Sequence, residues 1–258
     1  MARSGIEVQR AVIKALFMRE IKTRFGKYRL GYLWAVLEPA AHLMVMIGIF
    51  GYVMHRTMPD ISFPVFLING IIPFFIFSNI TNRCINAIEA NQGLFNYRPV
   101  KPIDTVIARA SLETIIYVIV YLILMSVLGV LGERFAFHNI LTLASAWFLL
   151  VLFSCGIGLV FMVVSNAFPE TEKFLPIATK PLYFISAIMF PLHSVPKEYW
   201  HYLTWNPLVH VVELSREAVV DGYISEGISL DYLLTSTLFV FFFGLMAYYN
   251  NEKAMLTS

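Results

Sequence analysis

The stretch NILTLASAWFLLVLFSCGIGLVFMVVS, residues 139–165, decides the fold class of this chain. It contains 27 residues and no Asp, Glu, Lys or Arg. At 1.5 Å per residue, a helix of this length exceeds the roughly 30 Å hydrocarbon core of a bilayer. Because that core holds no water, the backbone must satisfy its own hydrogen bonds, and a helix does so within one segment. The sequence therefore predicts a membrane-spanning helix here.

The composition of the whole chain also indicates a membrane protein. Hydrophobic residues make up 58% of the 258 residues and charged residues 14%, against roughly 25% charged in ordinary globular proteins. The mean hydropathy is +0.69, so the apolar residues cannot all be hidden in a soluble core. Soluble enzymes are largely excluded, and the net charge of +2 is too small to indicate a nucleic-acid partner.

Six apolar stretches are long enough to cross the membrane, which predicts an all-α integral membrane protein with six transmembrane helices. The fifth stretch holds Pro176, Lys180, Pro181 and Pro191, so a broken helix is expected there. The six stretches cover residues 32–54, 63–82, 105–131, 139–165, 174–193 and 231–250, within one transmembrane domain over 32–258.

The distribution of Lys and Arg sets the expected orientation, because positively charged loops stay on the cytoplasmic side. With the N-terminus inside, fifteen of the 19 basic residues fall on the cytoplasmic side. The other four are Arg56, Arg134, Lys197 and Arg216. We therefore expect both termini and the loop 83–104 in the cytoplasm, and the segment 194–230 on the outer side.

Residues 1–31 form a basic segment before the first span. Its eight Lys and Arg residues interrupt any short apolar region, so we expect no cleavable signal peptide and a retained first span. Residues 6–24 have enough helical periodicity to lie as an amphipathic helix on the inner membrane surface. Glu20 falls inside the apolar arc of that helix, so a disordered basic tail stays open as the alternative.

The loop between the second and third spans reads IEANQGLFNYRPVKP over residues 88–102. Gly93, Pro99 and Pro102 limit it to a short helix followed by an extended turn. Leu94, Phe95 and Tyr97 are costly to expose to water without a partner, which favours a docking element. A solvated connector is the alternative.

The outer segment 194–230 is long but not polar throughout. Pro196 and Pro207 each stand where a helix could begin, and Asn206 is a plausible N-cap for the second helix. Two short helices would form a re-entrant hairpin, which burial by protein must protect within the bilayer. An aromatic belt of Trp and Tyr at the interface is the compatible alternative.

Several kinds of reactive site are missing from the sequence. Gly26-Lys27 lacks the rest of a phosphate-binding loop, so this chain cannot hydrolyse ATP by that route. Cys84 and Cys155 are too few and too far apart for a disulfide framework or metal cluster, and the six His residues lack ligand spacing. We expect no catalytic residue and no metal site.

Four charged residues lie inside the expected spans, away from the first and last residue of each. Arg109 and Glu113 are four apart on one helical face, which favours a local ion pair. Lys180 could extend to the inner interface or meet an anionic lipid headgroup or phosphate. Glu38 precedes Pro39, which removes a backbone hydrogen bond, so a protein-facing and partly wet position is expected. The scattered charges argue against a proton-coupled pump.

Two motifs resemble a known family. The first is RFGKYRLGYLWAVLEP, residues 24–39, and the second is WNPL, residues 205–208, with Glu213 and Arg216 downstream. Together they resemble the membrane subunit of ABC-2 type polysaccharide exporters, with the capsular-polysaccharide export permeases of Gram-negative bacteria nearest. The resemblance covers the entire chain in family order. The second motif is shared with O-antigen and teichoic-acid exporters, so it identifies the class and not the polymer.

This resemblance implies a homodimer in the bacterial inner membrane, bound to two copies of a separate ATP-binding subunit that carries ATP and Mg. It also implies a periplasmic copolymerase and an outer-membrane exporter as further partners. In such proteins the loop after the second span forms a coupling helix seated in the ATPase. The residues at the matching positions are Glu89, Asn91, Gln92, Gly93, Leu94, Phe95 and Asn96.

The resemblance further implies that a lipid-anchored glycan passes between two protomers. Aromatic rings pack against the C–H faces of sugars, and we expect Tyr117, Tyr121, Lys180, Tyr183 and Phe184 as candidates for the path. The hairpin would shape the exit, with Trp205, Leu208 and Val212 buried against the spans and Glu213, Arg216 and Glu217 near its mouth. Asn206 and Pro207 would begin its second helix.

Three alternatives stay open at this stage. The chain could serve an ABC-2 exporter of another glycan, of the O-antigen or teichoic-acid type. A secondary transporter would usually show an internal repeat with matched broken helices, and we find no convincing repeat. A membrane-embedded enzyme acting on lipid-linked sugar would need clustered acid and base residues at one membrane face, which are lacking.

Overall fold

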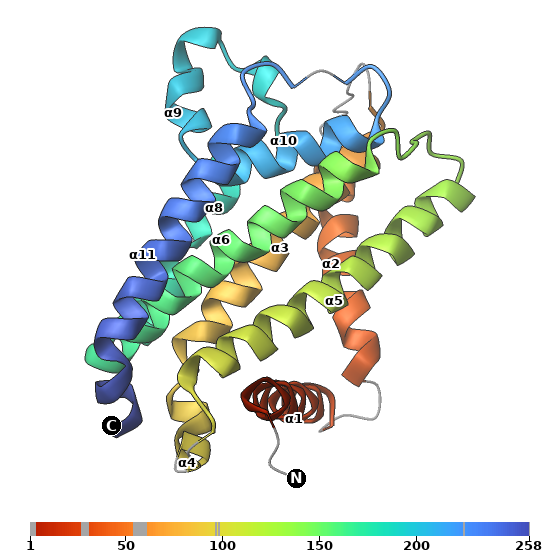
Figure 1. The fold of residues 1–258 in the computed structure, drawn as a ribbon. Coiled ribbons are helices and arrows are strands. Elements are labelled where there is room, and N and C mark those ends of the chain that lie inside the picture. The colour runs from red at the N-terminus through yellow and green to blue at the C-terminus, as the bar shows by residue number, and fades with distance from the viewer. Residues whose placement is uncertain are drawn as a thin grey trace.

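The computed structural model describes residues 4–26, 31–53, 61–95, 97, 99–223 and 225–257, and these segments contain helices and connecting turns but no strand (Figure 1). Five helical segments are long and apolar enough to cross a membrane. The first is α2, Gly31–Met46, continued by the π-helical turns Ile47–Val53. The others are α3, Phe63–Ile85; α5, Pro102–Val130; α6, Ile140–Ala167; and α11, Leu230–Thr257. The all-α membrane fold is confirmed.

The fifth expected span is broken, as its prolines predict. It forms α7, Thr171–Ala178, and α8, Lys180–Ile185, which meet at Thr179. Pro181 lies in the first turn of α8 and has no N–H to continue the hydrogen bonds of α7. Beyond α8 the chain turns through Ala187, whose φ of 56° lies in the left-handed region.

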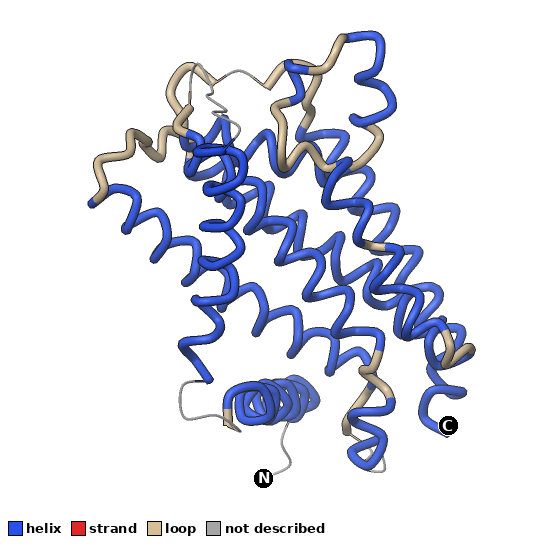
Figure 2. The backbone as a smooth tube through the Cα atoms, turned by 180° about the vertical axis from the view of Figure 1, so that it is seen from behind, coloured by secondary structure: helices blue, strands red, loops and turns tan. Residues whose placement is uncertain are grey.

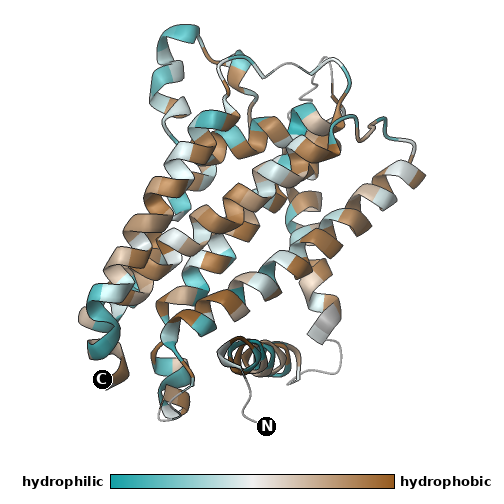
Figure 3. Ribbon diagram, in the orientation of Figure 1, coloured by the Kyte–Doolittle hydropathy of each residue, from teal (hydrophilic) through white to brown (hydrophobic). Residues whose placement is uncertain are grey.

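Helix α3 forms the centre of the bundle. Of its most apolar stretch 78% is buried, against 11% for the first span and 17% for α11. It packs against α5, α6 and the short helix α10, Pro207–Val219. The outer faces of α2 and α11 carry exposed apolar side chains such as Trp34, Phe239 and Phe242, as a face toward hydrocarbon requires. Hydrophobic residues are frequent along the long helices (Figure 3).

One charge on the first span does not lie as expected. Glu38 is exposed in the single chain, whereas Pro39 beside it is buried. The expectation of a protein-facing Glu38 is therefore wrong for this chain, because the buried stripe of α2 passes through the proline and not the carboxylate.

Helices α6 and α11 approach each other through two glycines. A Cβ on Gly244 would lie 2.4 Å from the Gly156 carbonyl oxygen, and a Cβ on Gly156 would lie 2.8 Å from the Phe241 Cα. Only residues without a side chain allow this backbone contact, the usual device for close helix packing in membranes. The contact holds the peripheral α11 against the bundle.

Both chain ends lie at the same end of the bundle (Figures 1 and 2). Helix α1, Gly5–Phe25, lies across this end beneath α5. The short helix α4, Gln92–Phe95, is at the same end, whereas α9, Trp200–Thr204, and α10 are at the other. The segments that the sequence assigns to one side of the membrane are therefore grouped in space.

Candidate functional site

The loop between α3 and α5 folds as a short helical segment, as its Gly and Pro residues predict. A 3₁₀ turn over Glu89–Asn91 leads into α4. Asn91 is 2% exposed, and its Nδ2 donates to the Ala87 carbonyl at 2.8 Å. Asn91 therefore fixes the loop from within and is not a surface contact. Asn96, which the resemblance places in the coupling helix, lies outside the described residues.

Arg19 of α1 holds this loop from outside. Its Nη2 donates to the Ala90 carbonyl at 2.7 Å, and its Nη1 donates to Asn91 Oδ1. Leu94 lines a groove of about 420 Å³ together with Val8, Val12 and other residues of α1. The loop and α1 therefore form one assembly, which we call the coupling assembly: α1 together with residues 86–95.

The coupling assembly leaves one face of α4 uncovered. Leu94 and Phe95 are half-buried, so the expectation that both are exposed is only partly met. Tyr97 is 65% exposed, and Gly93 is exposed with no atom within 4 Å of where its Cβ would be. Glu89 and Gln92 are exposed on the same short segment. This face is available to a partner protein.

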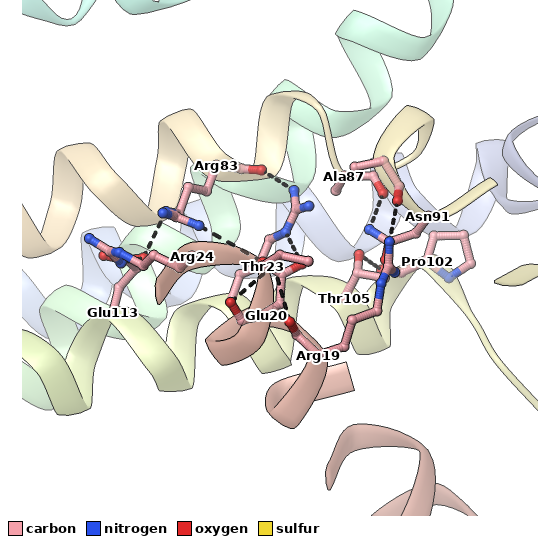
Figure 4. Close-up of polar contacts among 12 residues, drawn as sticks. Arg19, Glu20, Thr23, Arg24, Arg83, Ala87, Asn91, Pro102, Thr105 and Glu113 are labelled. Carbon is pink, nitrogen blue, oxygen red and sulfur yellow. Dashed lines mark hydrogen bonds and ion pairs between the residues drawn. The ribbon is translucent and has the colours of Figure 1, made fainter. Parts of the chain in front are cut away.

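A buried charge cluster joins α1 to the transmembrane helices (Figure 4). Arg109 Nε of α5 lies 2.9 Å from Glu20 Oε1 of α1. Arg83 Nε of α3 lies 2.7 Å from Glu113 Oε1 of α5, and Arg24 of α1 binds the same oxygen. Glu20, Arg109 and Glu113 are 8%, 7% and 0% exposed, so water screens these pairs weakly.

The cluster corrects the expected local ion pair. Arg109 and Glu113 share a helical face, but they do not bond each other, because α1 and α3 supply better-placed partners for both. The cluster also explains why Glu20 interrupts the apolar arc of α1: the carboxylate is buried against α5. The ordered helix, begun by a capping box between Ser4 and Glu7, rules out the disordered tail over its length.

The second helix of the outer hairpin begins as its sequence predicts. Asn206 Oδ1 accepts a hydrogen bond from the Leu208 N–H at 3.1 Å, and Pro207 is the first residue of α10. Asn206 Nδ2 also donates to Ser186 Oγ at 3.0 Å, which ties the hairpin to the turn after α8. The N-cap is confirmed, and Leu208 and Val212 are buried as expected.

Trp205 does not follow that expectation. Its side chain is 64% exposed, so its predicted burial against the spans is wrong in the single chain. Tyr199 and Tyr202, which precede it in the same short segment, are 54% and 65% exposed. The hairpin thus has a buried helix, α10, and an exposed aromatic turn around α9 of the kind that anchors at a membrane interface.

Glu213 and Arg216 are also corrected, because they are internal and not at a mouth. They are 1% and 0% exposed, and Arg216 Nη1 lies 2.8 Å from Glu213 Oε1. The Arg216 guanidinium lies 3.5 Å from the centre of the Phe66 ring, and its Nη2 donates to the Ile188 carbonyl at 3.0 Å. Glu217, in contrast, is exposed.

Two further contacts complete this internal pair. The Leu192 N–H donates to Glu213 Oε1 at 3.2 Å, and the Tyr223 hydroxyl donates to Glu213 Oε2 at 2.6 Å. Burial raises the pKa of the Tyr223 phenol, so it remains a donor at neutral pH. Glu213 and Arg216 therefore join α10 to α3 and to the segments on both sides of the hairpin.

His210 ties the hairpin to the last span. Its Nδ1 accepts from the Ser229 N–H at 3.0 Å, so its Nε2 carries the proton and donates to the Thr204 carbonyl at 2.6 Å. Burial lowers the pKa of this imidazole, and the neutral form matches both partners.

The described residues contain no group of three His, Cys, Asp or Glu side chains placed to bind a metal ion.

An aromatic cavity of about 710 Å³ lies between α2, α3 and the broken pair α7 and α8. Lys180, Tyr183 and Phe184, which the sequence proposes for a substrate path, line it together with His42 and Phe74. The Tyr183 ring packs edge-on against Phe74 and His42 at centroid distances of 5.1 and 5.6 Å. The structure thus brings three of the five candidate path residues together.

The other two candidate path residues lie elsewhere. Tyr117 is 3% exposed, and its hydroxyl accepts from Asn79 Nδ2 at 2.9 Å. Tyr121 is 2% exposed, donates to Asn69 Oδ1 at 3.0 Å and packs against Trp147. Both rings share a face, as expected, but in this chain that face is occupied by α3 and α6.

Sequence reasoning missed several residues of these sites. His42, Phe74 and Asn82 line the cavity, and Arg19 holds the coupling loop. Each lies far in sequence from the residues it joins, and only the break in the fifth span indicated that a cavity could form there.

Comparisons with known proteins identify the family of this chain. The profile of the ABC-2 type transporter family matches residues 11–220. The polysialic acid transport protein KpsM of Escherichia coli is 69% identical over 258 residues, which cover 100% of both chains. The capsule polysaccharide export inner-membrane protein BexB of Haemophilus influenzae is 26% identical over 253 residues, 98% of this chain and 96% of that one. The corresponding protein CtrC of Neisseria meningitidis serogroup B is 28% identical over 241 residues, 93% of this chain and 91% of that one.

Proposed function

This chain belongs to the ABC-2 type transporter family, and we propose that it is the inner-membrane permease subunit of an ATP-driven exporter of capsular polysaccharide. The observation that carries this proposal is the 69% identity to a polysaccharide transport protein along the full length of both chains. The similarity to two capsule export proteins of other organisms supports the same substrate class. As a permease subunit, the chain is not itself an enzyme.

We further propose that two copies of this chain bind two copies of a separate ATPase, which holds ATP and Mg. The exposed face of α4 and the nearby Tyr97 support this part of the proposal, because Gly93 and Tyr97 are both exposed beside an otherwise well-fixed loop. The cargo is a lipid-anchored glycan. A periplasmic copolymerase and an outer-membrane exporter would carry it onward.

The coupling assembly suggests how ATPase motion reaches the membrane. A push on the loop passes to α1 through Arg19 and from α1 to α5 and α3 through the charge cluster. Because each contact in this series is buried or half-buried and hydrogen-bonded, the parts move together instead of sliding. The energy of ATP hydrolysis would thus act on the central helix of the bundle.

The proposed function and the contact with the ATPase are tested by replacing Gly93 with leucine in a strain that depends on this chain for export. A leucine there has open space in this chain and suits a helix better than glycine, so folding and abundance are expected to stay unchanged. At a packed interface the added side chain costs about 1–3 kcal/mol. We expect copurification with the ATPase, and surface polymer measured by immunoassay, to fall about tenfold or more, while polymer accumulates inside the cell.

Gly93→Ala is the matched control, since its single methyl group is far less demanding. If Gly93→Leu copurified and exported as the parent does, the α4 face would not be the ATPase contact. If deletion of the whole chain left surface polymer unchanged, the proposed function itself would be wrong.

We propose that both termini and the coupling assembly face the cytoplasm, with support from the basic-residue asymmetry and from their common end of the bundle. Single cysteines at the exposed positions Glu89 and Glu226, in a chain with Cys84 and Cys155 replaced by alanine, provide the test. With the outer membrane permeabilised, an impermeant thiol reagent is expected to label position 226 but not position 89. The reverse pattern would invert the topology.

A further inference from the structure

Among the described residues, one side of α1 combines basic with apolar side chains and stays largely open. Ile6, Arg10 and Lys14 follow one another at intervals of four residues, the spacing that makes side chains neighbours on a helix. Ile6 is 69% exposed, and Arg10 and Lys14 are exposed as well. Ile13 and Phe17 lie beside them, three residues after Arg10 and Lys14, and are half-buried. We call these five residues the basic side of α1.

The basic side of α1 lies away from the coupling loop. The part of α1 that faces the loop lines a groove with Val8 and Val12. Arg10 is two residues from each of them, which is about 200° around a helix. Neither Arg10 nor Lys14 forms an ion pair within the described residues. Both charges are therefore available to a partner on the side of α1 opposite the loop.

The contacts of α1 with α5 show the level at which α1 lies. Its side chains bond α5 at Asp104, Arg109 and Glu113. From the first to the last of these positions is about 14 Å along α5, and α5 is long and apolar enough to cross a membrane. Helix α1 runs across this end of the bundle, beneath α5 (Figure 1). It therefore lies beside the first turns of a membrane-spanning helix, where a bilayer has its headgroups.

This level and this composition together favour a lipid partner. Basic residues interleaved with apolar ones are typical of helices that lie in the plane of a membrane interface. The apolar side chains of such helices enter the acyl region, and anionic headgroups attract the basic side chains. The proposed ATPase contact is on α4, at the loop, so an ATPase seated there would leave Arg10 and Lys14 uncovered.

We propose that the basic side of α1 binds anionic phospholipid headgroups of the inner leaflet. Arg10 and Lys14 pair with the headgroup phosphates, and Ile6 enters the acyl region beside them. This inference rests on the proposed function and orientation, because it gives the coupling assembly a second partner besides the ATPase. Bound lipid holds α1 from the side that neither the loop nor α5 covers.

The test uses the complete transporter, permease with ATPase, purified in detergent and titrated with phosphatidylglycerol or phosphatidylcholine. Native mass spectrometry resolves the lipids bound to each complex and gives their binding constants. The parent is expected to bind phosphatidylglycerol more tightly than phosphatidylcholine. Arg10→Gln combined with Lys14→Gln should weaken binding of phosphatidylglycerol about tenfold or more, as for loss of two basic residues at an anionic surface. Binding of phosphatidylcholine should stay unchanged.

Two further variants separate position from charge. Lys22→Gln is the matched control for Lys14→Gln, because both remove one exposed lysine from α1 and Lys22 lies outside the basic side. Lys14→Gln should weaken binding of phosphatidylglycerol severalfold, and Lys22→Gln should bind as the parent does. Arg10→Lys combined with Lys14→Arg keeps both charges and should retain the preference. Equal losses in Lys14→Gln and Lys22→Gln would overturn the proposal, because the effect would then come from the net charge of α1.

The double glutamine variant separates this inference from the proposed function. If it copurified with the ATPase and kept the full preference for phosphatidylglycerol, the lipid site would be refuted and the permease function would stay intact. If it kept that preference but lost the ATPase, the basic side would be a protein contact and the lipid site would again be refuted. Loss of ATPase association in the parent chain would instead refute the permease function.

Discussion

Replacement of Arg216 by alanine is expected to destabilise the chain by about 3–5 kcal/mol, the usual cost of leaving a buried charge without its partner. Glu213, which is 1% exposed in the parent chain, would lose its counter-charge. The Ile188 carbonyl would lose its donor, and the Phe66 ring would lose the guanidinium above it. We expect the purified protein in detergent to unfold at a temperature lower by roughly 10 °C.

Lysine is not expected to rescue this position. The guanidinium reaches Glu213, the Ile188 carbonyl and the Phe66 ring at the same time, whereas an ammonium group is a single point charge without a planar face. Arg216→Lys should therefore recover less than half of the lost stability. A variant that unfolded at the parental temperature would contradict the structural role of Arg216.

A double replacement separates charge from packing. Arg216→Met combined with Glu213→Leu removes both charges and keeps apolar volume, which is often tolerated in buried pairs. Recovery should be partial, because Glu213 also accepts from the Leu192 N–H and the Tyr223 hydroxyl, and both donors would be left unpaired. The double variant is expected to be more stable than Arg216→Ala and less stable than the parent.

These residues show where sequence reasoning succeeds and where it ends. The helix start at Asn206 and Pro207 and the break before Pro181 were predictable, because a cap or a missing N–H acts within one turn of the chain. The spans were predictable because apolar length alone decides them. The partners of Arg216 were not, since Phe66 is 150 residues away in sequence. Glu213 and Arg216, which were expected to face solvent, are fully buried.

The same limit applies to the coupling assembly. The sequence pattern of α1 placed Glu20 on an apolar arc. It could not identify Arg109 as the partner of Glu20, because Arg109 lies 89 residues further along the chain. The i to i+4 rule predicted an ion pair between Arg109 and Glu113, because that rule considers only side chains of the same helix. Three helices contribute to the cluster, so its pairing is decided by tertiary packing. The cavity has the same origin, with its lining drawn from α2, α3, α7 and α8.

Replacement of Glu113 by glutamine is expected to have the largest effect on coupling. Glu113 Oε1 is shared by Arg24 of α1 and Arg83 of α3, and its Oε2 has no partner among the described residues. Glutamine keeps the volume and one acceptor, but it leaves Arg24 without a counter-charge and leaves Arg83 with only Glu20, at 3.8 Å. Hydrogen bonds to charged groups contribute about 1.5–3 kcal/mol each, so α1 should be held much more weakly against α3 and α5.

Weaker attachment of α1 predicts a specific functional defect. The face of α4 stays intact, so the ATPase should still copurify and still hydrolyse ATP, whereas polymer exported per ATP should fall about tenfold. Lys22→Gln serves as the control, because Lys22 is exposed on the same helix and its loss removes a charge without touching the cluster. Export by the Lys22 variant should equal that of the parent.

A double-variant cycle decides whether the ion pair itself transmits the motion. Arg24→Gln alone should impair export, and combined with Glu113→Gln it should add less than its own single effect, because the two side chains act through one contact. Strict additivity of the two export defects would mean that Arg24 and Glu113 act separately. Loss of ATPase binding in either single variant would place the defect in assembly. An additive result or an assembly defect would refute transmission through the cluster, since this path requires α1 to stay joined to the loop by Arg19 while it loosens only from α3 and α5.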